Sequence, residues 1–207
     1  MITLENTSTL EKLVKQALPL WGISEPVELK LLSYSENATY LIKNEVNQWV
    51  MRIHRKGYHT IDGVRSEIAW MQALREDMEL ETPQALEGLN GEFLQLIPDS
   101  DESEPRMIVL FEFVEGKEPD ATDLVVAAEQ LGFITAQLHK HAKQWELPNY
   151  FQRQHWDLEG AFGQNPNWGH WLAGFDQNTQ GLEIVQKAEL KMHERLNTFG
   201  KSKNKYG

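Results

Sequence analysis

The order of residue patterns along the chain is what most limits the folds open to it, and that order changes near Glu115-Gly116. Upstream, short segments alternate apolar and polar residues, which is the period of a β-strand with one buried face. Downstream, apolar residues recur every three or four positions, which is the period of an amphipathic helix. Strands followed only by helices predict an α+β protein in two parts, residues 1–115 and 116–207.

The upstream part predicts an antiparallel sheet with one inserted helix. Short turns separate the first three strand patterns, so an antiparallel meander is the simplest arrangement. Thr60 can cap a helix whose apolar residues, from Ile61 to Leu74, have helical spacing. Residues 85–88 and 92–98 are expected to form a hairpin. The segment 106–116 is apolar on both faces, so it should lie in the centre of the sheet or be covered on both sides.

One strand pattern, WVMRIH, contains an arginine, Arg52. Alternation places Arg52 on the same face as Val50 and His54. Glu67 borders the apolar face of the helix that follows, so its carboxylate is well placed to meet the guanidinium. Burying either charge without a partner would be costly. Two alternatives stay open from the pattern: an Arg52–Glu67 pair inside the fold, or a solvated charge on an edge strand.

Composition excludes several classes of function. The formal net charge is −11, which argues against general affinity for nucleic acid or anionic membranes. The basic run from Arg52 to His59 also lacks the interleaved aromatic residues of a stacking surface, so a nucleic-acid patch is disfavoured. The chain has no Cys, which excludes disulfides and thiolate metal sites. With no signal peptide and no long apolar run, we expect a soluble, cytoplasmic protein.

Familiar catalytic and metal-binding motifs are absent. There is no GxGxxG or GxxxxGK[ST] phosphate loop, no HExxH and no GxSxG. His139 and His141 stand at a helix end, where cations complement the helix dipole, so no metal site is predicted there. His155-Trp156-Asp157 begins like an HxD catalytic loop, but Phe162 occupies the position that needs Asn. The turn 35–37 can offer a hydroxyl and backbone amides to a phosphate, or be an ordinary turn.

Four stretches taken together resemble a known enzyme family. They are SENATYLI, WVMRIHRKGYHT, RSEIAWMQAL and IVLFEFVEG. Their order and spacing are similar to the small lobe of aminoglycoside-phosphotransferase-type kinases, closest to the homoserine kinase type II-like branch. The resemblance extends over residues 27–200. It implies a protein-kinase-like fold, in which ATP is held between an antiparallel five-stranded small lobe with an inserted helix and a second, helical lobe.

The resemblance implies a phosphate site on the small lobe. Arg52 stands where the family has a strand-three Lys or Arg that contacts the nucleotide phosphates, and Glu67 stands at the position of its partner on the helix. An Arg fork can bond a phosphate and a carboxylate, so Arg in place of Lys keeps the role. Ser35 and Asn37 fall on the turn that covers the phosphates.

The resemblance also implies an adenine site. Glu112 and Val114 fall on the hinge, where backbone C=O and N–H groups would pair with adenine, and Phe111 would flank the ring. The implied function is ATP-dependent phosphorylation of a hydroxyl on a small molecule, such as an amino alcohol, a sugar or an aminoglycoside. The implied cofactors are ATP and Mg²⁺.

The chain departs from the family in its catalytic residues. The family's HGDxxxxN-like loop and its second Asp, which supply the catalytic base and the Mg²⁺ ligands, have no match in this sequence. We therefore expect an inactive fragment, the small lobe and the opening of a helical lobe that stops before the catalytic loop. The alternative is a non-catalytic pseudokinase module that binds nucleotide or a partner. Apolar helix faces that lack their usual cover are expected to associate with a second copy or another chain.

Overall fold

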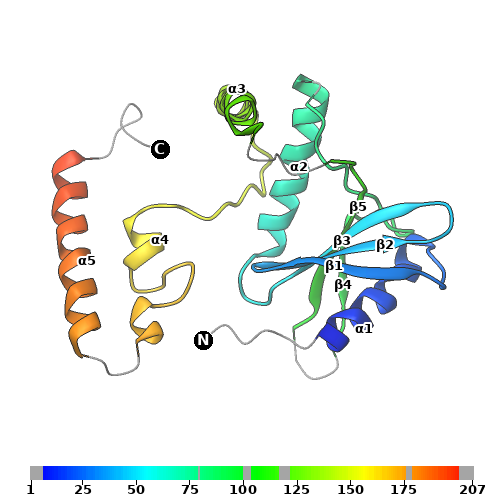
Figure 1. Ribbon diagram of the computed structural model, residues 1–207, viewed down its shortest axis with the longest axis horizontal. Helices are drawn as coiled ribbons and strands as arrows, with labels where there is room; N and C mark the ends of the chain where they lie inside the picture. Colours follow the sequence, from blue (N-terminus) through cyan, green and yellow to red (C-terminus); the bar gives the residue numbers. More distant parts are fainter. Residues whose placement is uncertain (1–6, 79, 100–103, 117–121, 176–178, 201–207) are drawn as a thin grey trace. The chain divides into compact units, whose positions relative to one another are not determined.

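The computed structural model describes residues 7–78, 80–99, 104–116, 122–175 and 179–200 (Figure 1). Helices and strands follow the order expected from the patterns, and every strand among the described residues lies upstream of Gly116. The elements are α1 Thr7–Ala17, the 3-10 helix η1 Leu18–Trp21, β1 Glu28–Tyr34, β2 Asn37–Lys43, β3 Gln48–His54, α2 Ile61–Met78, β4 Leu94–Ile97, β5 Arg106–Glu112, α3 Leu124–Ala142, α4 Leu158–Phe162, the 3-10 helix η2 Trp171–Gly174 and α5 Thr179–Phe199.

The five strands form one antiparallel sheet in the order β1-β2-β3-β5-β4. The predicted meander of the first three strands is confirmed, and so is the inserted helix, α2. Thr60 caps this helix, because its hydroxyl accepts a hydrogen bond from the N–H of Gly63 at 3.0 Å. The α+β architecture expected from the sequence is therefore present.

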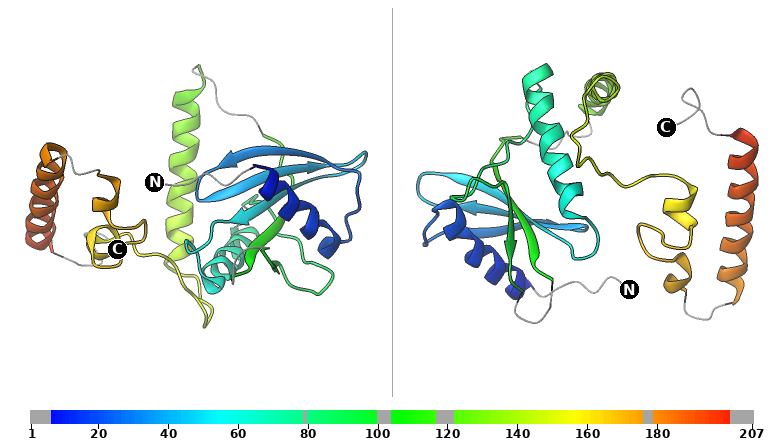
Figure 2. Two further views of the ribbon diagram at one scale, coloured as in Figure 1. Left: turned by 90° about the horizontal axis from the view of Figure 1, so that it is seen from below. Right: turned by 180° about the vertical axis from the view of Figure 1, so that it is seen from behind.

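Helices α1 and α2 cover opposite faces of the sheet (Figures 1 and 2). On the α1 face, the core is built from residues such as Leu10, Tyr40 and Met51, all almost fully buried. On the α2 face, a smaller core contains Val64 and Ile68. Strand β5 contributes alternate side chains to both cores, as its two apolar faces predict.

The hairpin predicted around Leu89-Asn90-Gly91 is only half formed. The turn is present, with Gly91 at φ 79° and its N–H bonded to the C=O of Gly88 at 2.9 Å. Its second arm is β4, but its first arm makes a single bridge, from Ala85 to Phe111. The prediction of a strand at 85–88 was wrong because this arm meets β5, not β4, and leaves it after one residue pair.

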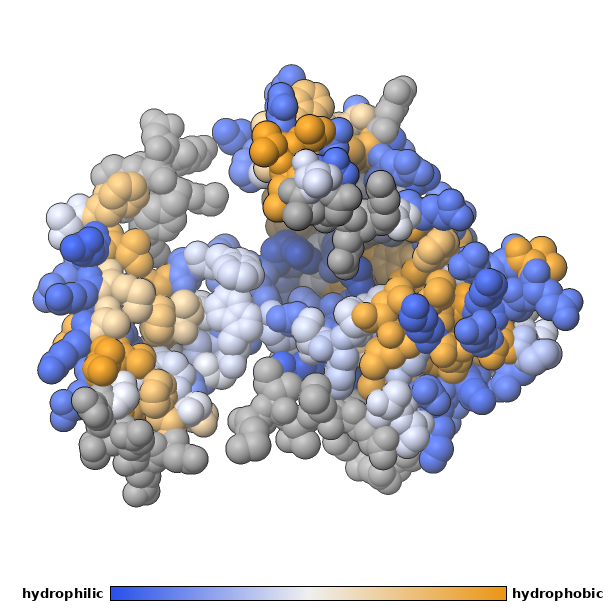
Figure 3. Space-filling view, in the orientation of Figure 1, coloured by the Kyte–Doolittle hydropathy of each residue, from blue (hydrophilic) through white to orange (hydrophobic). Residues whose placement is uncertain are grey.

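Apolar side chains are exposed over most of α3. Val125, Leu131 and Phe133 are each at least 65% exposed, and the only side chain of this helix that is buried among the described residues is His141. An apolar patch lies over α3 in the space-filling view (Figure 3). This exposure was expected from the sequence, and covering of the helix by a second copy or another chain stays a prediction.

By its contacts the chain divides into two compact units, one comprising Glu5–Arg153 and the other containing the residues from Gln154 onward. In the second unit, Asp157 caps α4 by accepting a hydrogen bond from the N–H of Gly160 at 2.9 Å. Asn167 donates to the C=O of His155 at 2.9 Å and closes the intervening loop. The helices that the structure describes include none long and apolar enough to cross a membrane.

Candidate functional site

Arg52 and Glu67 form a direct pair on the α2 face of the sheet. The Nη1 of Arg52 lies 2.6 Å from the Oε1 of Glu67, and the two side chains are 28% and 24% exposed. Arg52 belongs to β3, which is flanked on both sides by β2 and β5, so the edge-strand alternative was wrong. The predicted pair is confirmed because strand alternation and helix spacing bring both side chains to the same layer.

The ring of Phe111 forms the floor under Arg52. The guanidinium carbon lies 5.0 Å from the centroid of the ring, within the range of a cation–π contact. Phe111 is only 3% exposed and belongs to the smaller core, so its ring gives the guanidinium a rigid surface to pack against. Because the ring is covered in this way, contact between Phe111 and adenine stays a prediction.

Glu67 contacts a second arginine, Arg153, at 3.6 Å between Oε2 and Nη1. Burial opposes ionisation of Glu67, but the charge and hydrogen bond of Arg52 and the charge of Arg153 outweigh it, so the pKa of Glu67 lies below its usual value. Two guanidinium groups thus surround one carboxylate. The cluster carries an excess positive charge in a chain whose formal net charge is −11.

The turn that was predicted to cover the phosphates lies between β1 and β2. Ser35 donates its hydroxyl to the carboxylate of Glu36 at 2.6 Å, and this hydrogen bond lowers the pKa of Glu36. Asn37 begins β2 and is paired in register with His54, two residues along β3 from Arg52. Among the described residues, the structure joins Arg52 and Glu67 directly but records no side-chain contact between them and Ser35 or Asn37. A phosphate role for these two residues stays a prediction.

The predicted hinge follows directly from β5. Glu112 is the last residue of this strand, and its N–H is bonded to the C=O of Gln84 at 2.9 Å. Only the C=O of Glu112 therefore remains for a pairing with adenine. Val114, two residues further on, is 42% exposed. The hinge assignment stays a prediction, in which the C=O of Glu112 accepts a hydrogen bond from adenine and the N–H of Val114 donates one.

His54 is a buried neighbour of Arg52 that sequence reasoning did not single out as a site residue. It is 2% exposed, and neither ring nitrogen has a hydrogen-bond partner among the described residues. Burial, reinforced by the charge of Arg52, lowers the pKa of His54 from 6.5 to about 3. His54 is consequently neutral at physiological pH and adds no charge to the arginine cluster.

This histidine makes the stability of the fold depend on pH. In the unfolded chain His54 takes up a proton as the pH falls below 6.5, whereas the folded chain does so only near pH 3. As the pH is lowered from 6.5 towards 3, the free energy of unfolding should therefore decrease, by up to about 1.4 kcal/mol per pH unit. Replacing His54 by Leu should flatten the decline between pH 7 and pH 5, as measured by urea unfolding. Replacing the exposed His155 by Leu is the control. An equal decline of the unfolding free energy in wild type and H54L would contradict the prediction.

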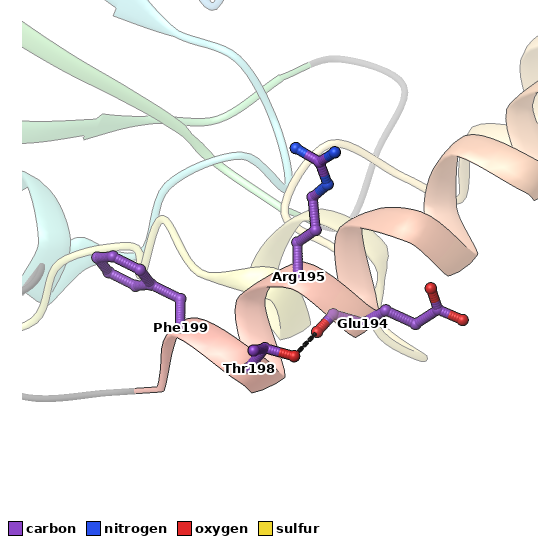
Figure 4. A pocket seen from close by; sticks show the side chains of 4 residues that line it. All are labelled: Glu194, Arg195, Thr198 and Phe199. Atoms are coloured by element: carbon purple, nitrogen blue, oxygen red, sulfur yellow. Dashed lines mark hydrogen bonds between the residues drawn. The ribbon is translucent and has the colours of Figure 1, made fainter.

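The structure also reveals two surface hollows away from this pair. One, of about 410 Å³, lies between α2 and α3 beside His141, whose Nε2 is 2.8 Å from the Oδ2 of Asp77 and whose Nδ1 accepts from the indole of Trp70 at 3.2 Å. The sequence predicts only a helix-dipole role for His141, because it does not show that α3 packs beside α2. The other is lined by residues near the C-terminal end of α5, shown in Figure 4: Glu194, Arg195, Thr198 and Phe199. In the described part of the chain, no three His, Asp or Glu side chains could hold a metal ion.

Comparison with known proteins identifies the family. The family model described as "Phosphotransferase enzyme family" matches residues 29–193. A microcompartment-associated aminopropanol kinase is 32% identical and superposes with a TM-score of 0.79 over 93% of this chain and 59% of its own. An amicoumacin kinase, solved with AMP-PNP, Ca²⁺ and amicoumacin, is 17% identical with a TM-score of 0.70, over 93% of this chain and 55% of its own, and supports the fold alone.

No curated protein sequence matches the chain. The chain spans between 55% and 59% of the length of the two structural relatives described above. The five-stranded sheet, the helices and these superpositions confirm the protein-kinase-like fold that the resemblance implied. Because the family model covers more than half of the sequence, the chain belongs to the phosphotransferase enzyme family.

Proposed function

We propose that this chain is the nucleotide-binding part of an ATP-dependent kinase that phosphorylates a hydroxyl group of a small amino alcohol. The observation that carries the proposal is the Arg52 guanidinium, held between the carboxylate of Glu67 and the ring of Phe111. A guanidinium fixed on two sides, yet 28% exposed, keeps N–H donors for a phosphate. Such a preorganised cation costs little reorganisation when the nucleotide arrives.

The substrate class rests on the relative of higher identity. The 32% identical structure is an aminopropanol kinase, and the net charge of −11 suits a substrate that carries an ammonium group. The catalytic Asp and the Mg²⁺ ligands of the family are not found in these 207 residues. We therefore propose that these residues bind nucleotide without transferring a phosphoryl group.

The direct test is calorimetric titration of the purified chain with ATP, ADP and adenosine. We expect affinity to increase with the number of phosphates, and ATP to raise the melting temperature. Absence of binding at millimolar ATP would overturn the proposal. Mg²⁺-dependent phosphorylation of aminopropanol by the chain would show that the part of the proposal concerning transfer is wrong.

The hinge gives a separate prediction. Replacing Val114 by Pro removes the N–H that would donate to adenine, so ATP and adenosine should both bind about 10-fold more weakly, as expected for one lost hydrogen bond that leaves an acceptor unpaired. Titration of V114P with both ligands measures the effect. Val114→Ala keeps the N–H and is the matched control. If V114P and V114A bind equally well, Val114 does not donate to adenine.

A further inference from the structure

Gln152, in the segment that follows α3, is hydrogen-bonded to the N-cap and first half of α2 through both its backbone and its side chain. Its backbone N–H donates to the hydroxyl of Ser66 at 2.9 Å, and its side-chain Oε1 accepts from the hydroxyl of Thr60 at 2.6 Å. Ser66 is fully buried and donates in turn to the C=O of Asp62 at 2.6 Å. These hydrogen bonds hold the backbone of Gln152 and so fix the backbone position of the next residue, Arg153.

From this position Arg153 reaches the carboxylate of Glu67, which Arg52 also contacts. The two arginines approach different oxygens of the carboxylate, Arg52 at 2.6 Å and Arg153 at 3.6 Å. The shorter distance is a charge-assisted hydrogen bond, whereas the longer one exceeds hydrogen-bond length and is an ionic contact only. Arg153 is also the more exposed of the two, at 45% against 28%. Its N–H donors are therefore less committed than those of Arg52.

The charges of the cluster do not balance. Among the described residues, the ion pairs of the cluster join two guanidinium groups to one carboxylate, that of Glu67. Burial is the first cause that lowers the pKa values of the neighbouring rings of His54 and His59, so both rings are neutral at physiological pH and add no charge. A partly exposed cluster with an excess cation, in an acidic protein, is suited to a multiply charged anion. A polyphosphate matches this charge better than a monophosphate.

We propose that Arg153 is a second phosphate-binding residue, which contacts the polyphosphate of the nucleotide beside Arg52 and favours ATP over AMP. This inference rests on the proposed function and deepens it by adding a residue from outside the sheet. Because Gln152 and Arg153 are adjacent, phosphate binding would also tie the segment after α3 more firmly to α2. Arg153 is the last residue of the unit that contains the sheet, so the whole cluster lies within that unit.

The test compares Arg153→Gln, Arg153→Lys and the control Arg65→Gln. Arg65 lies on α2, is 48% exposed and, within the described part of the chain, makes ionic contacts of 3.9 Å to Asp62 and Glu92, so it matches Arg153 in exposure and charge. R153Q should bind ATP about 10-fold more weakly and reduce its salt dependence, as expected for loss of one charge-assisted contact. Adenosine affinity and melting temperature should not change. R153K should recover part of the loss, and R65Q should bind ATP like the wild type.

Each alternative outcome has a distinct meaning. If the wild type binds ATP no better than adenosine, the phosphate site itself is wrong, and this inference falls with it. If the wild type prefers ATP but R153Q and R65Q bind it equally, only the role of Arg153 is overturned. If R153Q weakens ATP and adenosine by the same factor, or lowers the melting temperature, Arg153 acts on the fold and the proposal is also overturned.

Discussion

Replacement of Arg52 by Met should weaken ATP binding by about 100-fold, the effect of losing an approximately 3 kcal/mol charge-assisted contact to phosphate. Met keeps an unbranched apolar side chain over the ring of Phe111, so the floor of the site stays covered. Glu67 keeps Arg153 as a partner, which limits the cost of leaving a carboxylate partly buried. The variant should therefore fold and lose chiefly the interaction with phosphate.

Titration of R52M with ATP and adenosine separates the two parts of the nucleotide. Adenosine should bind R52M and wild type equally, because it carries no phosphate. Arg65→Met is the matched control, since it removes a charge from α2 whose ion pairs with described residues are 3.9 Å long, against 2.6 Å between Arg52 and Glu67. If R52M binds ATP within a factor of about 3 of wild type, which is less than about 1 kcal/mol, Arg52 is not a phosphate ligand.

The second large effect concerns stability. Arg106 is 3% exposed, and its Nε lies 3.2 Å from the Oδ2 of Asp99, which also contacts the Nζ of Lys56 at 2.9 Å. Replacing Asp99 by Asn takes the carboxylate charge away from this buried guanidinium and from Lys56, which should cost about 3 kcal/mol of unfolding free energy. For a chain of this size the melting temperature should fall by about 10 °C.

Thermal unfolding followed by circular dichroism measures this loss. Asp62→Asn is the control, because this carboxylate is 50% exposed and lies 3.9 Å from its arginine. The hydrogen bond from Lys56, with that from Arg106, holds the pKa of Asp99 below its ordinary value of 3.8. The stabilisation is therefore present above pH 3.8 and is lost as the pH falls through the lower, folded-state pKa. A D99N melting temperature within about 2 °C of wild type would contradict the prediction.

Most of the sheet could be predicted because its signals are local. Strand alternation and turn residues lie within a few positions of each other, as at Asn44, whose side chain accepts from the N–H groups of Val46 and Asn47 and closes the β2–β3 turn. The failed strand at 85–88 shows the limit. Its residues have a strand's composition, but their only bridge among the described residues is to Phe111, and no local pattern specifies that partner.

The residues of the candidate site also differ in whether local sequence patterns or long-range packing place them. Arg52 and Glu67 could be paired in advance because a strand and the next helix place them by simple periodicity. His54 could be placed on the face of Arg52, but its complete burial follows from elements packed around it. Arg153 could not be predicted at all, because its contact with Glu67 depends on the path of the chain after α3.

By itself the sequence determined the order of strands and helices and the side of β3 that carries Arg52, and it offered Glu67 as the partner in one of two open alternatives. These depend on residue periods and on the cost of an unpaired buried charge, both readable over short distances in the chain. The tertiary structure alone decided that one carboxylate serves two arginines and that β5 takes its neighbours from both β3 and β4. Such contacts join residues far apart in sequence, and only the packing of complete elements selects among them.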